Sequence, residues 1–401
     1  MSTAIIISIC GLLLLAYLFD ITAPRTRVPA VILLLLLGWL VKQGVLFFEI
    51  PLPGLAGFLP ILGSIGLILI VLEGALELEL NRSKKMVIIR SFVSALLPIV
   101  ILSIGFAWLF KHFLGYSFRD ALVNVIPLCV ISSSIAISAG RSLSPQGREF
   151  IVYESSLSDI IGVLLFNFVV LNDSINMPAM AEFSIQLGLI IVVSFVATIL
   201  LSFMLNKIDH HIKFAPIILL VILIYEISKE YDLPALLFIL LFGLFIGNLD
   251  EFKSVKWIQK LRPDKLQKEV DKFREITTEA TFLIRSLFFL LFGFLMETSE
   301  LLNIDTLNWS LLIVAAIFVV RAVVLKITAT PLMPYVFLAP RGLITILLYF
   351  AIAPGDQIAI VNNSLVLQVI VLSSLLMMFG MMFTKSENVG IKPAQLVDEQ
   401  L

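Results

Sequence analysis

The sequence predicts an all-α, polytopic membrane protein with about thirteen transmembrane helices. Of its 401 residues, 60% are hydrophobic and only 14% are charged, whereas soluble domains are about 45–50% apolar. The apolar residues also form runs close to the roughly 20 residues that a helix needs to cross a bilayer. Lys and Arg gather in alternate loops between these runs, as the positive-inside rule requires of a membrane protein.

The net charge and the positions of the two cysteines argue against several other kinds of protein or site. A net charge of −1, with no long run of one sign, argues against a basic nucleic-acid-binding protein. Cys10 and Cys129 both lie inside apolar runs, which is typical of small buried hydrophobic residues and not of a disulfide or a metal site. Residues 4–19 lack a basic segment before them, so we expect a first membrane helix there and no cleaved signal peptide.

The hydropathy pattern places the expected crossings in order along the chain. They lie near 3–19, 28–46, 61–78, 87–113, 119–140, 150–171, 183–205, 214–228, 233–250, 277–297, 308–330, 335–354 and 362–384. We refer to them as spans 1 to 13. The odd number predicts that the two ends of the chain lie on opposite sides of the membrane.

The loop charges predict the orientation. Loops on the side of the C-terminus hold nineteen Lys and Arg, whereas the opposite side has three, Lys111, Arg119 and Lys229. We therefore expect a multi-pass protein of the inner or plasma membrane, with the C-terminus in the cytoplasm and the N-terminus outside. The longest loop, 251–276, mixes charges with Trp257 and Phe273. It is either an amphipathic helix on the inner face or a solvated connector.

Asp159 is the clearest functional candidate, because placing an ionisable side chain inside the membrane costs about 2.5–3.5 kcal/mol or more of insertion free energy. On a helix through span 6, Ser155 and Asp159 share one stripe, and Glu154 and Ser158 share the neighbouring one. A carboxylate with a hydroxyl one turn away offers oxygen ligands to a monovalent cation, and the same carboxylate can bind a proton instead. The alternative is an acid that only holds helices together.

Glu154 needs a basic partner, because a buried acid without a counter-ion costs several kcal/mol or takes up a proton. Arg321 lies midway through span 11 and is the first choice, and Arg341 in span 12 is the second. We expect this pair to be structural, since an Arg does not release its proton.

Two spans carry interruptions at matching places. Ser132, Ser133 and Ser134 break span 5, and the segment 340–342, Pro-Arg-Gly, breaks span 12. We expect the hydroxyls of these three serines, with those of Ser155 and Ser158, to help bind the cation. Seven spans separate the two interruptions, so the broken helices run in opposite directions. This predicts two inverted six-helix repeats with crossed discontinuous helices 5 and 12 at the substrate site.

Other charged residues in the spans are less informative. Glu73, in the cytoplasmic half of span 3, is predicted to attract the ion on its inward route. Arg285 and Glu226 have no evident role and are interpreted as structural.

These residues resemble the cation:proton antiporter superfamily, nearest its electroneutral sodium/proton exchanger branch, over almost the whole chain. Glu154, Ser155 and Asp159 are similar to that branch's Glu-Ser-x-x-Asn-Asp motif, and Glu73 to its acidic third helix. Arg321 and the Arg341-Gly342 step also resemble basic positions of the branch. The resemblance implies a homodimer with Asp159 as the shared carrier. It further implies dimerisation-domain helices in 1–78 and 214–297, core-domain helices in 87–171 and 308–384, a linker helix at 183–205 and a short cytoplasmic tail at 385–401.

Two departures concern ion selectivity. Ser158 replaces the Asn usual in the electroneutral branch, and the serines of span 5 are closer to those of potassium-efflux relatives.

The predicted function is monovalent cation/proton antiport by alternating access, with sodium, potassium or lithium competing with protons for Asp159. We expect electroneutral exchange, no cofactor and no enzymatic activity. The alternatives are a cation-coupled solute symporter, which needs a larger polar midplane pocket, and a channel, for which no filter loop is evident. An intramembrane hydrolase would need a base at depth that the sequence does not offer.

Overall fold

The computed structural model describes residues 2–26, 28–49, 55, 57–78, 84–140, 143–172, 177–207, 214–231, 233, 235–248 and 263–383. Every regular element in these ranges is a helix, and they contain no strand. This confirms the all-α fold class. The predicted tail at 385–401 and the first part of the loop 251–276 lie outside the described residues.

Sixteen labelled elements follow one another along the described chain. They are α1 (Ser2–Thr26), α2 (Ala30–Phe47), α3 (Phe58–Glu77), α4 (Lys85–Leu114), α5 (Phe118–Cys129), α6 (Ser133–Gly140), α7 (Pro145–Val170), α8 (Met177–Lys207), α9 (Phe214–Glu230), α10 (Ala235–Gly247), α12 (Pro263–Leu295), α13 (Thr298–Leu301), α14 (Ile304–Ile327), η3 (Tyr335–Phe337), α15 (Leu343–Phe350) and α16 (Asn363–Phe383).

Each predicted span coincides with a helix or with a pair of short elements. Spans 5 and 12 are the broken ones: α5 and α6 make up the first, and η3 and α15 the second. In the described part of the chain, nine helices or helix pairs are long and apolar enough to cross a membrane. The exact number of crossings stays a prediction.

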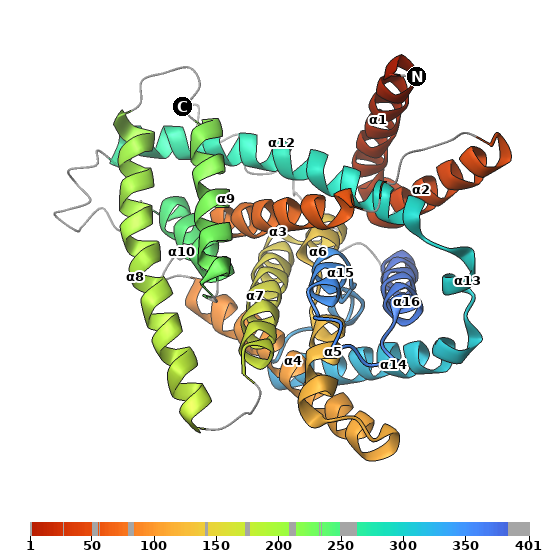
Figure 1. Ribbon diagram of the computed structural model, residues 1–401. Helices are drawn as coiled ribbons and strands as arrows, with labels where there is room; N and C mark the ends of the chain where they lie inside the picture. The colour runs from red at the N-terminus through yellow and green to blue at the C-terminus, as the bar shows by residue number, and fades with distance from the viewer. Residues whose placement is uncertain are drawn as a thin grey trace, which may run out of the picture.

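The helices form layers around a central group (Figure 1). Helices α3 and α12 run beside each other along one side, and α4 and α14 lie along the opposite side. Between them lie α5, α6, α7, α15 and α16. The packing falls into two sets: α4, α5, α6, α7, α14 and α16 contact one another, as do α2, α3, α8, α10 and α12. The broken helices therefore lie near the middle of the molecule.

The two interruptions meet at this centre. The N–H of Ser132 donates to the carbonyl of Pro340 over 2.9 Å, so irregular backbone from one break bonds to irregular backbone from the other. A Cβ on Gly342 would lie 2.7 Å from the Ser132 hydroxyl and 2.8 Å from Ile135. Only a glycine permits this close approach, and the two broken segments cross here as the inverted-repeat prediction requires.

The segment before span 10 differs from its prediction. Residues 263–276 are helical, as the first alternative expected, but they are the first part of α12, which runs without a break from Pro263 to Leu295. Val270 and Phe273 are fully buried, and the Phe273 ring packs against those of Phe214 and Phe242. Apolar contacts with α9 and α10 thus extend the helix beyond the apolar run that marks its membrane part.

Candidate functional site

Asp159 lies on α7 beside the point where the broken helices cross. Its side chain is only 3% exposed, and Ser133 is its nearest polar neighbour. Ser133 is the first residue of α6, so the carboxylate lies at the positive end of that helix. The Oδ1 atom of Asp159 is buried and has no hydrogen-bond partner among the described residues. A buried acceptor left open in this way is available for a cation or a proton.

The predicted hydroxyl ligands divide into two kinds. Ser155 donates to the carbonyl of Ile151 one turn earlier, over 2.7 Å, and Ser158 accepts from the backbone N–H of Ile131 over 2.9 Å. The Ser158 bond fastens the irregular backbone of span 5 to α7. The hydroxyls of Ser132 and Ser134 lie 3.1 Å apart in the break itself. All the serines predicted as ligands are buried at the crossing, and each hydroxyl retains a lone pair for a cation.

Glu154 and Arg321 form a buried, bidentate ion pair. The two guanidinium nitrogens lie 2.9 and 2.8 Å from the two carboxylate oxygens, and Nε donates to the Tyr335 carbonyl over 2.8 Å. Both side chains are at most 2% exposed. The pair ties α7 to α14 and to the start of span 12, and it leaves neither charge uncompensated.

Arg341, the second candidate partner for Glu154, donates to backbone carbonyls instead. Its Nε and Nη2 atoms lie 2.8 and 3.2 Å from the carbonyl oxygens of Leu128 and Cys129, and Nη1 donates to Ala339 over 2.8 Å. Leu128 and Cys129 end α5, where the last carbonyls have no helical partner. The guanidinium supplies those partners and a positive charge at the negative end of the α5 dipole.

One cavity of about 210 Å³ reaches the crossing from the side of Glu73. We call it the Glu73 cavity. It is lined by Tyr17 and Asp20 of α1, Glu73 and Glu77 of α3, Ser133 and Ser134 of α6, and Glu279 and Arg285 of α12. Four of these side chains carry carboxylates and one carries a guanidinium. The field inside therefore favours cations, and the lining includes Ser133, the neighbour of Asp159.

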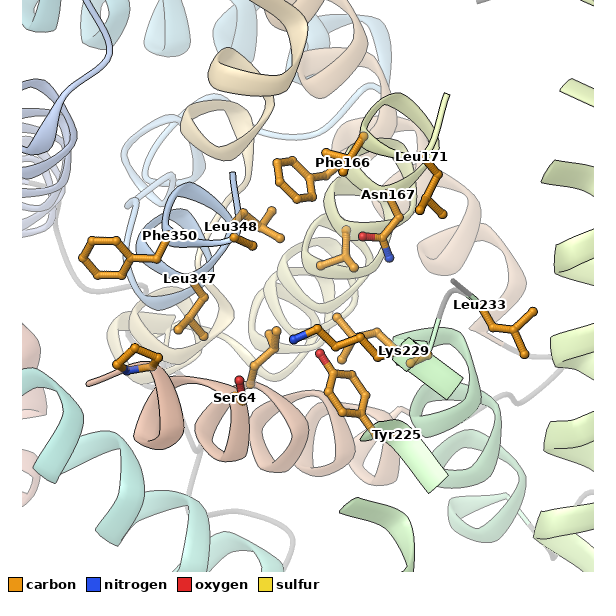
Figure 2. A pocket seen from close by; sticks show the side chains of 17 residues that line it. Ser64, Phe166, Asn167, Leu171, Tyr225, Lys229, Leu233, Leu347, Leu348 and Phe350 are labelled. Atoms are coloured by element: carbon orange, nitrogen blue, oxygen red, sulfur yellow. The ribbon is translucent and has the colours of Figure 1, made fainter. Parts of the chain in front are cut away.

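A second cavity of about 370 Å³ is lined by the first half of α3 and the last half of α7, on the other side of the crossing from Glu73. Figure 2 shows the side chains that line it. We call it the Lys229 cavity. Its lining includes Ser64 of α3, Val163, Phe166 and Asn167 of α7, Tyr225 and Lys229 of α9, and Leu347 of α15. It does not include Asp159 or the serines of span 5. In the described conformation, the site is therefore reached from the Glu73 cavity.

Sequence reasoning missed three residues near the site. Asp20 lies beyond the end of predicted span 1, yet it lines the Glu73 cavity 4.0 Å from Arg285. Ser138 lines the same cavity, and its buried hydroxyl has no partner among the described residues. Ser156 is buried with an unpartnered hydroxyl, and a Cβ on Gly74 would lie 3.1 Å from it. The three serines at 155, 156 and 158 in span 6 were the available signal for Ser156.

The arrangement suits the transport of one small cation. Discontinuous helices cross at a buried carboxylate, helix ends face the site, and an acidic cavity leads to it, as in ion-coupled secondary transporters. Residues 10–385 match the profile of the sodium/hydrogen exchanger transmembrane family, and the chain belongs to that family. It is therefore a cation/proton antiporter by family and not an enzyme.

Solved structures share this fold. The sodium proton antiporter MjNhaP1 from Methanocaldococcus jannaschii, determined at pH 8, is 18% identical with a TM-score of 0.68; the match covers 96% of this chain and 99% of that one. A second structure, an electron-microscopy map of the same antiporter, gives 18% identity and a TM-score of 0.66, covering 94% and 95%. No curated protein matches the chain at a significant level.

Proposed function

We propose that the protein exchanges one monovalent cation for one proton, and that both bind the Asp159 carboxylate in turn. The observation that carries this proposal is the open Oδ1 of Asp159, buried at the crossing of the broken helices. In this scheme Ser133, Ser134 and Ser155 contribute hydroxyl oxygens near the carboxylate. A charged carboxylate is costly to move through the membrane, so the core crosses only when a cation or a proton neutralises it.

Glu73 acts before the site in this scheme. It lines the cavity that ends at Ser133 and Ser134, together with three further carboxylates. These acids raise the local concentration of cations on their way to Asp159. The Glu73 cavity opens to the cytoplasm in the orientation that the loop charges predict, which makes the described state inward-facing.

Alternating access then requires one set of helices to move against the other. The set containing α4–α7, α14 and α16 holds Asp159 and both ion-paired residues, and it corresponds to the predicted core domain. We assign α2, α3, α10 and α12 of the second set to the dimerisation domain, and α8 of the same set to the linker. Movement of the first set past the second would close the Glu73 cavity and open the Lys229 cavity. A homodimer would hold the second set still.

The one-for-one stoichiometry depends on which side chains at the crossing can exchange a proton. Ser158 is a hydroxyl that accepts a hydrogen bond from the Ile131 N–H. Glu154 is held by both guanidinium nitrogens of Arg321. Only Asp159 is left at the crossing to exchange a proton for a cation.

The test uses the purified protein in lipid vesicles that contain a pH-sensitive dye. A pulse of sodium, potassium or lithium should move protons in the wild-type protein, and Asp159→Asn should abolish this movement while the protein remains folded. Asp305→Asn is the matched control, because Asp305 is exposed at the start of α14. Proton movement retained in Asp159→Asn would refute the assignment of the site.

Cation-coupled solute symport is the alternative, and the same vesicles separate the two. A symporter would move protons or cations only after an organic solute is added, whereas an antiporter needs the cation alone.

A further inference from the structure

The Lys229 cavity has an electrostatic character opposite to that of the Glu73 cavity. Among the described residues that line it, Lys229 and Tyr225 are the ionisable ones, and none is a carboxylate. Figure 2 shows Lys229 extending from α9 into the cavity, with Tyr225, Ser64 and Asn167 directed into the same space. No ion pair of Lys229 forms with a described residue. Glu226, one turn earlier on α9, is exposed and lies outside this lining, so the ammonium is the one formal charge among the described residues that line the cavity.

A cation that reaches or leaves Asp159 on the side opposite the Glu73 cavity would pass through the Lys229 cavity. Val163, in its lining, follows Asp159 by four residues on α7, which is one turn or about 6 Å along the helix axis. Val163 and Phe166 are both buried and close the floor of the cavity in the described state. When the core moves, a cation that leaves Asp159 toward this side passes beneath Lys229.

We propose that Lys229 disfavours cations in the outer vestibule, so that the exchanger releases its cation readily on this side and rebinds it weakly. The proposal rests on the function proposed above, because it assigns a kinetic role to one face of the same transport site. Four carboxylates concentrate cations at one mouth, and one ammonium repels them at the other. The apparent affinity for sodium is then lower on the Lys229 face than on the Glu73 face.

The size of the effect follows from Coulomb's law. One unit charge across a partly hydrated cavity, weakened by ions in the medium, changes the local concentration of a monovalent cation by about threefold. Removing the charge should lower the sodium KM on the Lys229 face by this factor. The KM on the Glu73 face, measured separately, should stay the same.

The experiment measures sodium-driven proton movement in membrane vesicles of both orientations. The face of Lys229 is first fixed by labelling Lys229→Cys with a membrane-impermeant maleimide, in a background where Cys10 and Cys129 are replaced by serine. Lys229→Gln removes the charge, and Lys229→Arg is the matched control that keeps it. The maximal rate in both variants checks that the transport machinery is intact.

The expected result is a sodium KM about threefold lower on the Lys229 face in Lys229→Gln, unchanged in Lys229→Arg, and a difference that shrinks when choline chloride is added. The proposal is overturned if Lys229→Gln leaves this KM unchanged, or if the KM shifts equally on both faces. Failure of the proposed function would look different, because the wild-type protein would then move no protons in response to sodium in either orientation.

Discussion

Replacing Glu154 by Gln should destabilise the protein strongly. The substitution keeps the shape of the side chain but removes its charge, and it leaves the Arg321 guanidinium buried at 2% exposure with only the Tyr335 carbonyl as a charge-independent partner. Breaking a buried pair by removing one partner costs about 3–5 kcal/mol. We expect a loss of this size in the free energy of unfolding, measured by equilibrium unfolding in detergent micelles.

The same helix offers a matched control for this experiment. Glu149 lies on α7 and pairs with Lys84 over 2.7 Å, but both side chains are more than a quarter exposed. Glu149→Gln should therefore cost about 1 kcal/mol, near the upper end of the range for exposed ion pairs, because this pair is partly exposed. The double variant Glu154→Gln, Arg321→Gln should recover part of the loss, because no uncompensated charge remains. Equal, small effects for Glu154→Gln and Glu149→Gln would refute the idea that Glu154 neutralises Arg321.

Two further predictions concern the crossing and the stoichiometry. Gly342→Ala should lower stability by about 1–3 kcal/mol and slow transport, because its Cβ would lie 2.7 Å from the Ser132 hydroxyl; melting curves should show no change for Gly355→Ala, which has open space around it. Electroneutral exchange predicts that the initial rate of sodium-driven proton movement stays constant when valinomycin and potassium gradients impose different membrane potentials. A steep dependence on potential would mean that a second proton is carried, by Glu73 or Glu154.

Some of the site could be predicted because the membrane makes charge expensive. Glu154 needed a cation, and Arg321 was the nearest buried one in a facing span; the structure places the two side chains in a bidentate contact. The two interruptions were visible as a serine run and a Pro-Arg-Gly step, and the structure joins them through Ser132 and Pro340. In each case the sequence shows a buried charge or an interrupted helix, which costs free energy inside the membrane. The structure removes that cost by pairing the charge or by bonding the interrupted backbone.

The other features of the site depend on how the helices lie beside one another, and the hydropathy pattern does not give this placement. Arg341 could be assigned to Glu154 or to a helix end only once the end of α5 was placed beside it. Asp20 and Arg285 meet in one cavity although 265 residues separate them in the chain. The extension of α12 to Pro263 could not be predicted from a charged segment, because the burial of Phe273 arises from packing against α9 and α10.

The central claim is that cation and proton compete for Asp159, and the sodium dependence of the exchange rate at several pH values tests it most directly. Competition for one carboxylate predicts that the apparent sodium KM rises as pH falls, approaching about tenfold per pH unit where protons dominate. The maximal rate at saturating sodium should then stay nearly constant. A sodium KM that does not change with pH, with a maximal rate that falls instead, would show that protons act at a separate site and would contradict the account.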